Sequence, residues 1–490
     1  MKILYLDIDS LRPDRLGCYG YERATSPAID RLAREGVRFE NVYVSDSPCL
    51  PSRTALWSGR HGFRTGVVDQ GGAAAEPFRE GRQRGFRDLF HAAGWMTALR
   101  QAGHHTASIS SFAERHSAWH WHAGLNELIN PGLFGMDRAD EVVPLAIDWL
   151  RRRGHEKADW FLHVNLWDPH TPYRVPASFG DPFAEAPGPG WLDEATLARF
   201  RAGFGPHSAR EPTGFDGRGD ARFPRQPGPI ETMADAWAWW DSYDTSVRYM
   251  DEWIARLFEA LEQIGLAGET TIVLSADHGE NLGELNVWAD HQTADQITSR
   301  VPLIVRFADG RGAGRVDRAL HYQFDWAATL IELAGGRVPR EWDGVSFAAA
   351  LGEAREAGRE FLITSQGAWC CQRGVRFAQE GRDFLFLVTY HDGYKDFPLF
   401  MLYDLGTDPH ELVDLAADRP ELVGIAVTLL ERWRSAMMRR SGGEIDPLMR
   451  VMHEGGPFHC RGQLPAYLRR LKETGRDAAA RRLAERHPGE

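Results

Sequence analysis

Lysine is nearly absent from this chain of 490 residues. Only Lys2, Lys157, Lys395 and Lys472 occur, and every other basic residue is arginine. Acidic residues outnumber Lys and Arg by 69 to 57, which gives a net charge of −12. A sequence-independent nucleic-acid binder needs a basic face, so this balance argues against nucleic acid as a partner. An anionic small molecule remains compatible, because one cationic site can lie within an acidic surface.

Cysteine is also scarce, and long apolar runs are missing. The five cysteines are too few and too irregular for a disulfide framework or for the paired spacing of a zinc site. No stretch approaches the roughly 20 apolar residues of a membrane span. No charged and apolar leader precedes the first expected strand. We therefore expect a cytoplasmic protein without a membrane partner, and the sequence does not indicate its oligomeric state.

The remaining composition is that of a large folded protein, with 43% hydrophobic and 26% charged residues. Short β-rich runs alternate with helical patterns up to about residue 345. We expect strands at 3–8, 97–99, 106–109, 161–166, 270–274 and 301–305, and long helices at 142–151 and 237–264. A Gly- and Pro-rich surface excursion is expected at 176–229. This alternation predicts an α/β fold with a mostly parallel central sheet flanked by helices.

The pattern changes after residue 345. Strands are expected at 361–364, 375–377 and 384–390, followed by a helix at 420–438. We therefore divide the chain into a larger N-terminal domain, 1–345, and a smaller C-terminal α+β domain, 346–490, with an irregular and helical tail.

Acidic residues and histidines gather where three of the expected strands end. They are Asp7, Asp9, Asp168, His170, Asp277 and His278. Ligand sites of open α/β sheets lie at the carboxyl ends of strands, so we expect these side chains to converge. Asp7 and Asp9 are two residues apart and face the same side of a strand. Helix capping would explain any one of these aspartates alone. The whole set of aspartates and histidines favours a binding site for a hard divalent cation.

A second signal is the segment Cys49-Leu50-Pro51-Ser52-Arg53. Proline is frequent in the first turn of a helix, so a helix is expected here. A bound anion would then meet free helix amides, the helix dipole and the Arg53 guanidinium. A small buried cysteine beside a capping turn is the alternative, and composition does not decide between the two.

The segment 49–60 resembles the sulfatase signature, in which Cys-x-Pro-Ser-Arg is followed by a Thr/Ala/Leu run and Gly-Arg. Further segments resemble the family in the same order, at 9–20, 167–173, 275–280, 300–304 and 402–411. The chain is thereby identified as a member of the formylglycine-dependent sulfatases, in the alkaline phosphatase superfamily. The resemblance implies an alkaline-phosphatase-like fold and hydrolysis of a sulfate ester, either of a carbohydrate or of an aryl alcohol.

The resemblance also implies the chemistry. A formylglycine-generating enzyme would oxidise Cys49 to formylglycine (3-oxoalanine), which reacts as its hydrate. One hydroxyl of the hydrate attacks sulfur and expels the alcohol, and deprotonation of the other then eliminates sulfate and restores the aldehyde. Arg53 would steady the nucleophile and the sulfate oxygens. His170 would protonate the leaving alcohol.

A divalent cation is the implied cofactor, usually Ca²⁺ in this family, with Mg²⁺ or Mn²⁺ as alternatives. The resemblance assigns it to Asp9, Asp277 and His278. Many members carry Asp-Asp after the first strand, whereas this chain has Asp9-Ser10. We expect Asp7, on the same face of the strand, to supply the second carboxylate.

Both lysines that usually flank the sulfate are missing from this chain. Their positions fall at Ser111 and at Asp290. We expect His116 to replace the first and His291 to hold the sulfate side of the site, with Lys395 as a weaker source of charge. Together with the histidine near the leaving group, these imidazoles would balance the sulfate.

Two other functions stay open from the sequence. A phosphonate monoester or phosphodiester hydrolase would share the nucleophile and the metal site. The serine of Pro-Ser-Arg favours a sulfatase, because that subgroup often has Pro-Ala-Arg. A non-catalytic binding protein is the second alternative, if Cys49 is never oxidised.

Overall fold

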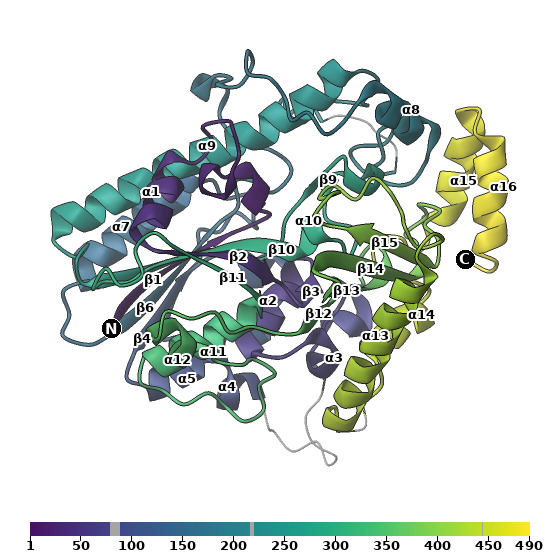
Figure 1. The fold of residues 1–490 in the computed structure, drawn as a ribbon. Helices are drawn as coiled ribbons and strands as arrows, with labels where there is room; N and C mark the ends of the chain where they lie inside the picture. Colours follow the sequence, from purple (N-terminus) through teal and green to yellow (C-terminus); the bar gives the residue numbers. More distant parts are fainter. Residues whose placement is uncertain (79–88, 216–219, 443) are drawn as a thin grey trace.

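Two β-sheets organise the chain (Figure 1). The structure is a computed structural model, and it describes residues 1–78, 89–215, 220–442 and 444–490. The larger sheet is built from the first two thirds of the sequence. The smaller sheet and the last helices lie beside it, next to the C-terminus (Figure 1).

The larger sheet has eight strands, and only one of them runs against the others. In spatial order they are β11 (Arg315–Tyr322), β2 (Val37–Tyr43), the antiparallel β10 (Arg300–Arg306), β7 (Thr270–Ala276), β1 (Lys2–Ile8), β6 (Trp160–Leu166), β4 (His105–Ile109) and β5 (Glu127–Ile129). The central strands are apolar along most of their length because helices cover both faces. The expected mostly parallel sheet is confirmed.

Helices cover both faces of this sheet (Figure 1). On one side lie α1 (Pro27–Glu35), α7 (Ala139–Arg153) and α9 (Met233–Ile264), and on the other α2 (Cys49–Ser58), α4 (Leu89–Ala93), α5 (Trp95–Gln101), α11 (Gln323–Leu333) and α12 (Ala348–Gly352). Shorter elements are α3 (Gly62–Thr65), α6 (Phe112–Arg115), α8 (Glu194–Ala202), α10 (Gln296–Ser299) and the hairpin of β8 (Asn281–Leu282) and β9 (Trp288–Asp290). Within the described ranges, no helix combines the length and apolar character needed to cross a membrane.

The smaller sheet has the order β15–β14–β13–β12–β3. Its antiparallel strands are β12 (Phe361–Gln366), β13 (Cys371–Gln379), β14 (Arg382–His391) and β15 (Phe400–Asp404), and helix α13 (Pro420–Arg440) packs against them. The edge strand β3 (Asp46–Ser47) comes from the N-terminal part of the chain and pairs in parallel with β12. The smaller C-terminal α+β unit is therefore present, although it borrows one strand. The boundary at 345/346 stays a prediction.

One local expectation was wrong, and another held only in part. Residues 97–99 lie inside α5, where Trp95, Met96, Ala98 and Leu99 are buried at helical spacing, so a short apolar run was mistaken for a strand. The tail contains the expected helices, but it is more regular than expected. It forms α14 (Pro447–His453), α15 (Leu464–Glu473) and α16 (Asp477–Arg486), and the last two pack together.

Candidate active site

The candidate site lies at the carboxyl edge of the larger sheet. β1 lies between β7 and β6 and runs parallel to both, so the residues that follow these strands meet at one edge. Asp9 follows β1, His170 lies shortly beyond β6, and Asp277 follows β7 directly. The fold therefore brings together side chains that are far apart in the sequence.

Cys49 is the first residue of α2 and is almost completely buried. Its Sγ lies 3.1 Å from Nε2 of His278. Burial, followed by the carboxylates of Asp9 and Asp277, raises the pKa of the thiol well above its usual value. An unmodified thiol in this position stays protonated at neutral pH, so a thiolate nucleophile is disfavoured.

Arg53 lies one turn further along the same helix and contacts three carboxylates. Its Nε donates to Asp7 Oδ2 at 2.7 Å, and its Nη1 donates to Asp9 Oδ2 at 2.9 Å and to Asp277 Oδ2 at 2.6 Å. Among the described residues, its Nη2 is buried and has no hydrogen-bond partner. One donor of the guanidinium is thus left for a bound anion.

Four side chains at this edge could hold a metal ion. The ligand atoms of Asp9, Cys49, Asp277 and His278 all lie within 4.8 Å of one another. Nδ1 of His278 lies 2.8 Å from the Gly279 carbonyl oxygen. Because a carbonyl only accepts, Nδ1 carries the proton and Nε2 presents its lone pair to the group. This tautomer is the one that a metal ligand requires.

The charge of the site also fits a cation. Burial, followed by the neighbouring carboxylates of Asp9 and Asp7, raises the pKa of Asp277 well above its usual value even though Arg53 lies beside it. The site therefore holds more negative charge than one guanidinium neutralises. Carboxylate oxygens are the ligands preferred by hard divalent ions, so the donor set fits the expected cofactor.

Asp7 lies outside the four-residue group. Its Oδ2 accepts the Arg53 hydrogen bond and lies 3.1 Å from Nε2 of His163. Its Oδ1 is buried without a hydrogen-bond partner in the described part of the chain. Asp7 thus holds Arg53 in place, and its role as a metal ligand stays a prediction.

One of the expected histidines, His291, lies beside His278, and a second, His170, lies beside His291. The ring centroid of His291 is 4.2 Å from that of His278 and 5.4 Å from that of His170. Both imidazoles are buried. Asp168, in the same loop as His170, instead accepts a hydrogen bond from the first amide of α7, that of Ala139, at 3.2 Å. Helix capping therefore explains Asp168.

The third histidine, His116, follows α6 and packs on Phe112 with ring centroids 5.1 Å apart. Its neighbour Arg115, which sequence analysis missed, is half-buried, and its Cζ lies 5.3 Å from the centroid of the Trp167 ring. The positive charge of Arg115 acts to lower the pKa of Cys49, of His170 and of His291. Its position after β4, the neighbour of β6, was the available signal.

The surroundings of these three histidines do not support the expected positive charge on their rings. Burial, with the charge of Arg115 among the further causes, lowers the pKa values of His116, His170 and His291. In the free protein these imidazoles are therefore neutral. A permanent positive charge beside them comes from Arg115 instead.

The two positions where the family usually has lysine are used differently here. Ser111 donates a hydrogen bond from its hydroxyl to the buried carboxylate of Asp137. Oδ2 of Asp290 lies 2.8 Å from Nε2 of His207. Lys395 is buried, and its Nζ donates to the carbonyl of Pro206 in the surface excursion. Lys395 therefore joins the two units and is not a free cation at the site.

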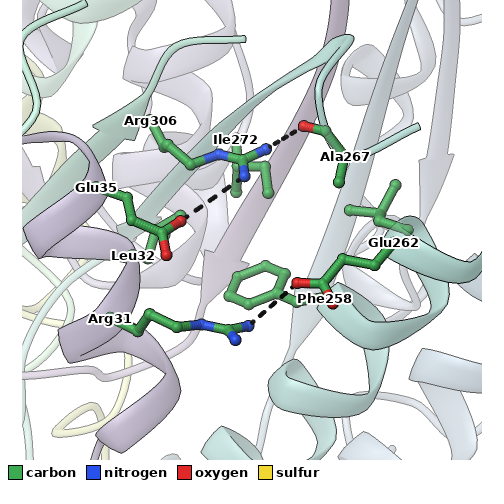
Figure 2. Close-up of a pocket in the computed structure, with 9 residues that line it drawn as sticks. Arg31, Leu32, Glu35, Phe258, Glu262, Ala267, Ile272 and Arg306 are labelled. Atoms are coloured by element: carbon green, nitrogen blue, oxygen red, sulfur yellow. Dashed lines mark hydrogen bonds and ion pairs between the residues drawn. The ribbon is translucent and has the colours of Figure 1, made fainter. Parts of the chain in front are cut away.

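A surface depression elsewhere shows none of this chemistry (Figure 2). It lies at the amino end of β7, on the edge of the sheet opposite the candidate site. Its charged groups pair with one another: Arg31 lies 3.9 Å from Glu262, and Arg306 lies 3.8 Å from Glu35 (Figure 2). No buried nucleophile lines it.

Two family patterns match the chain. Residues 2–336 match the family described as Sulfatase. Residues 283–437 match the family described as N-sulphoglucosamine sulphohydrolase, C-terminal. The first match covers well over half of the chain, including every residue of the candidate site.

Individual relatives are more distant. The N-acetylglucosamine-6-O-sulfatase of Bacteroides thetaiotaomicron is 24% identical over 84% of this chain and 81% of its own length. A protein solved in complex with its substrate D-glucosamine-2-N,6-O-disulfate has a TM-score of 0.70 at 19% identity, covering 91% of this chain and 99% of its own. The phosphonate monoester hydrolase of Silicibacter pomeroyi has a TM-score of 0.66 at 19% identity, covering 92% and 97%. These structures establish the similarity of the fold.

Proposed function

Because the chain belongs to the sulfatase family, we propose that it hydrolyses sulfate esters at the edge of the sheet where Cys49 lies. It is an enzyme of the sulfuric ester hydrolase class. The observation that carries the site assignment is the position of Cys49, at the start of α2 and 3.1 Å from His278, within a group that also holds Asp9 and Asp277.

Cys49 is the proposed nucleophile after oxidation to formylglycine by a maturation enzyme. The modification would replace a protonated, buried thiol with an aldehyde whose hydrate supplies an oxygen nucleophile. Arg53 positions this residue from the same helix, and its free Nη2 donor faces the substrate anion. Asp7 and the two metal-side aspartates fix the guanidinium from the other side.

Asp9, Asp277 and His278 would hold the divalent cation, which would supply positive charge to polarise the sulfuryl group. Their oxygen-rich donor set is compatible with Ca²⁺, Mg²⁺ or Mn²⁺. The identity of the ion and the cytoplasmic location stay predictions.

His170 is the proposed donor of a proton to the leaving alcohol. It is neutral in the free protein, because burial lowers its pKa well below the usual range. A bound sulfate group places negative charge beside the imidazole, and a nearby opposite charge raises the pKa of histidine. Substrate binding would therefore bring His170 toward the protonated form at the moment when the proton is needed.

Arg115 is the proposed cation for the sulfate group in place of the missing lysines. His291 would act as a hydrogen-bonding group next to it, and His116 would line the same side. An arginine presents a planar set of donors that matches the oxygens of a sulfate. The substrate class that we propose is a sulfated carbohydrate, in agreement with the names of the relatives.

The test is a substrate panel on matured protein. It compares para-nitrophenyl sulfate, sulfated monosaccharides, a phosphonate monoester and a phosphodiester. Preference for the sulfate esters supports the proposal, whereas preference for the phosphonate would favour the function of the similar hydrolase from Silicibacter pomeroyi. Mass spectrometry of the Cys49 peptide in the same sample excludes a protein that was never oxidised.

A further inference from the structure

A run of side-chain contacts leads outward from the nucleophile. Cys49 Sγ lies 3.1 Å from His278, whose ring centroid is 4.2 Å from that of His291. The backbone amide of His291 donates to Asp290 Oδ1 at 2.7 Å. Asp290 occupies one of the two positions where the family usually has lysine. It contacts segments of the chain that lie beyond the edge of the sheet.

The run continues into the tail of the chain. Asp290 Oδ2 lies 2.8 Å from Nε2 of His207, and the His207 ring packs edge-on against Trp369 at 5.2 Å. Trp369 in turn stacks on His459, with centroids 4.6 Å apart and planes at 18°. Nε2 of His459 lies 2.7 Å from Oε1 of Gln70. Four distant segments of the chain therefore meet beside the candidate site.

A second path, through hydrogen bonds, holds His459 in this place. Gln366 Nε2 donates to the carbonyl of His291 at 2.7 Å, and Gln366 Oε1 accepts from the amide of Ala368 at 2.7 Å. The carbonyl of Ala368 accepts from the amide of His459 at 3.1 Å. His459 is thus tied to the backbone of an active-site histidine through two residues of one loop.

The surroundings of His459 define its protonation. The Gln70 oxygen can only accept, so Nε2 of His459 carries the proton. Burial lowers the pKa of His459 to about 4, so the ring is neutral near pH 7 and Nδ1 presents a lone pair. No hydrogen bond to Nδ1 occurs among the described residues. The residue is half-buried, and Nδ1 is not one of the fully buried polar atoms that lack a partner among the described residues, so this acceptor keeps some exposure.

We propose that Nδ1 of His459 accepts a hydrogen bond from a hydroxyl group on the alcohol portion of the substrate, and so favours a polyhydroxylated, saccharide-type sulfate ester. The inference rests on the proposed function of the site. Asp290 adds a second acceptor nearby, so this side of the site suits hydroxyl or N–H donors rather than a further anion. The two family matches cover residues 2–336 and 283–437, and His459 lies outside both ranges.

The test compares two substrates on three variants. His459→Phe keeps a ring to stack on Trp369 but removes the acceptor, whereas His459→Asn keeps an oxygen near the position of Nδ1. His453→Phe changes an exposed histidine of the same segment and serves as the control. The substrates are para-nitrophenyl sulfate, which has no hydroxyl group, and the best-hydrolysed member of a panel of monosaccharide sulfates.

His459→Phe should lower kcat/KM about tenfold for the saccharide sulfate and less than about twofold for the aryl sulfate, the effect of one lost hydrogen bond. His459→Asn should recover part of that loss, and His453→Phe should resemble the wild type. Equal losses on both substrates, or no loss on either, would overturn the proposal. Hydrolysis of the aryl sulfate alone by the wild type would also overturn it, together with the proposed carbohydrate substrate class, and would leave only the sulfuric ester hydrolase activity intact. Hydrolysis of neither ester by matured protein would overturn the proposed function itself.

Discussion

Cys49 Sγ lies 3.1 Å from Nε2 of His278, although 229 residues separate the two along the chain. One residue begins a helix and the other follows a central strand. The contact places the candidate nucleophile within the donor set that would hold a cation. A change to either residue should therefore affect both catalysis and metal binding.

Replacing Cys49 should remove turnover without unfolding the protein. Cys49→Ser conserves the size of the buried side chain but cannot be oxidised by the same route, so we expect kcat to fall by at least about 10³-fold. In the wild type, conversion to formylglycine should lower the peptide mass by about 18 Da. The measurements are the peptide mass, the rate and the thermal transition. Substantial activity in a preparation of Cys49→Ser free of other hydrolases would contradict the assignment.

Removing Asp277 should remove the cation. Adding Ca²⁺, Mg²⁺ or Mn²⁺ to chelated wild type at about 100 times Kd should stabilise the fold by about 2.7 kcal/mol. Asp277→Asn takes one carboxylate from the donor set, so its thermal transition should not respond to the ion. Metal content and thermal transitions check this without reference to activity.

Two further variants complete the metal experiment. Asp148→Asn, on an exposed face of α7, is the control and should respond like the wild type. Asp7→Asn decides the remaining question: a lost response makes Asp7 a ligand, and a normal response limits it to holding Arg53. An unchanged metal content in Asp277→Asn would reject the proposed donor set.

Arg115 should control the affinity for the sulfate group. Arg115→Gln removes a charge-assisted contact, so we expect KM for a sulfate ester, and the inhibition constant of inorganic sulfate, to rise about tenfold or more. Arg115→Lys should keep part of the effect, because the charge remains while the planar donor set is lost. Arg152→Gln, in an exposed ion pair on α7, is the matched control. Equal sulfate inhibition in all four proteins would show that Arg115 does not meet the anion.

His170 should matter most when the leaving group is poor. His170→Ala removes the proposed proton donor, and such donors contribute about 10²–10⁴-fold to rates. The loss should be large for an alkyl or saccharide sulfate and small for para-nitrophenyl sulfate, whose phenolate leaves without help. A series of aryl sulfates of graded leaving-group acidity measures this. Equal losses along the series would assign His170 to binding instead.

A buried histidine outside the site should make stability depend on pH. His61 packs edge-on against Tyr322, Phe324 and Trp433, at 4.9, 5.1 and 5.3 Å. Burial lowers its pKa from 6.5 to about 4. Between these two pH values only the unfolded chain binds the proton, so this contribution is complete above pH 6.5. It falls by about 1.4 kcal/mol per pH unit as the pH drops toward 4.

The matched variant is His61→Phe, which keeps an aromatic ring in the same cage and cannot titrate. Urea unfolding at pH 7, 6 and 5 should show a weaker loss of stability in the variant than in the wild type. Parallel losses in the two proteins would mean that His61 does not contribute to the pH dependence.

The strands and long helices were predictable because their patterns are local. The strand at 3–8 is apolar except for Asp7, and α9 carries apolar residues at helical spacing over its whole length. The segment 97–99 was too short for its period to be recognised, and the helical spacing is visible only when Trp95 and Met96 are included. Cys49, Asp277 and His278 were found because each lies within a short motif.

Arg115 and His459 were missed because their surroundings arise only in the folded chain. Arg115 lies over the ring of Trp167, and its charge acts on Cys49 and His170. His459 meets Gln70, which is 389 residues away in the sequence. A lone arginine or histidine carries no spacing signal, so neither could be distinguished from a surface residue.

The short strand β3 connects the nucleophile to both sheets. It ends next to Pro48, pairs with β12 of the smaller sheet and leads directly into α2 on the larger one. The Asp46 carboxylate in this strand also accepts a hydrogen bond from Gly62 at 2.7 Å. A fragment that ended near residue 345 would keep every proposed catalytic side chain but lose the partner of this strand, so the segment that leads into Cys49 depends on the smaller sheet for its pairing.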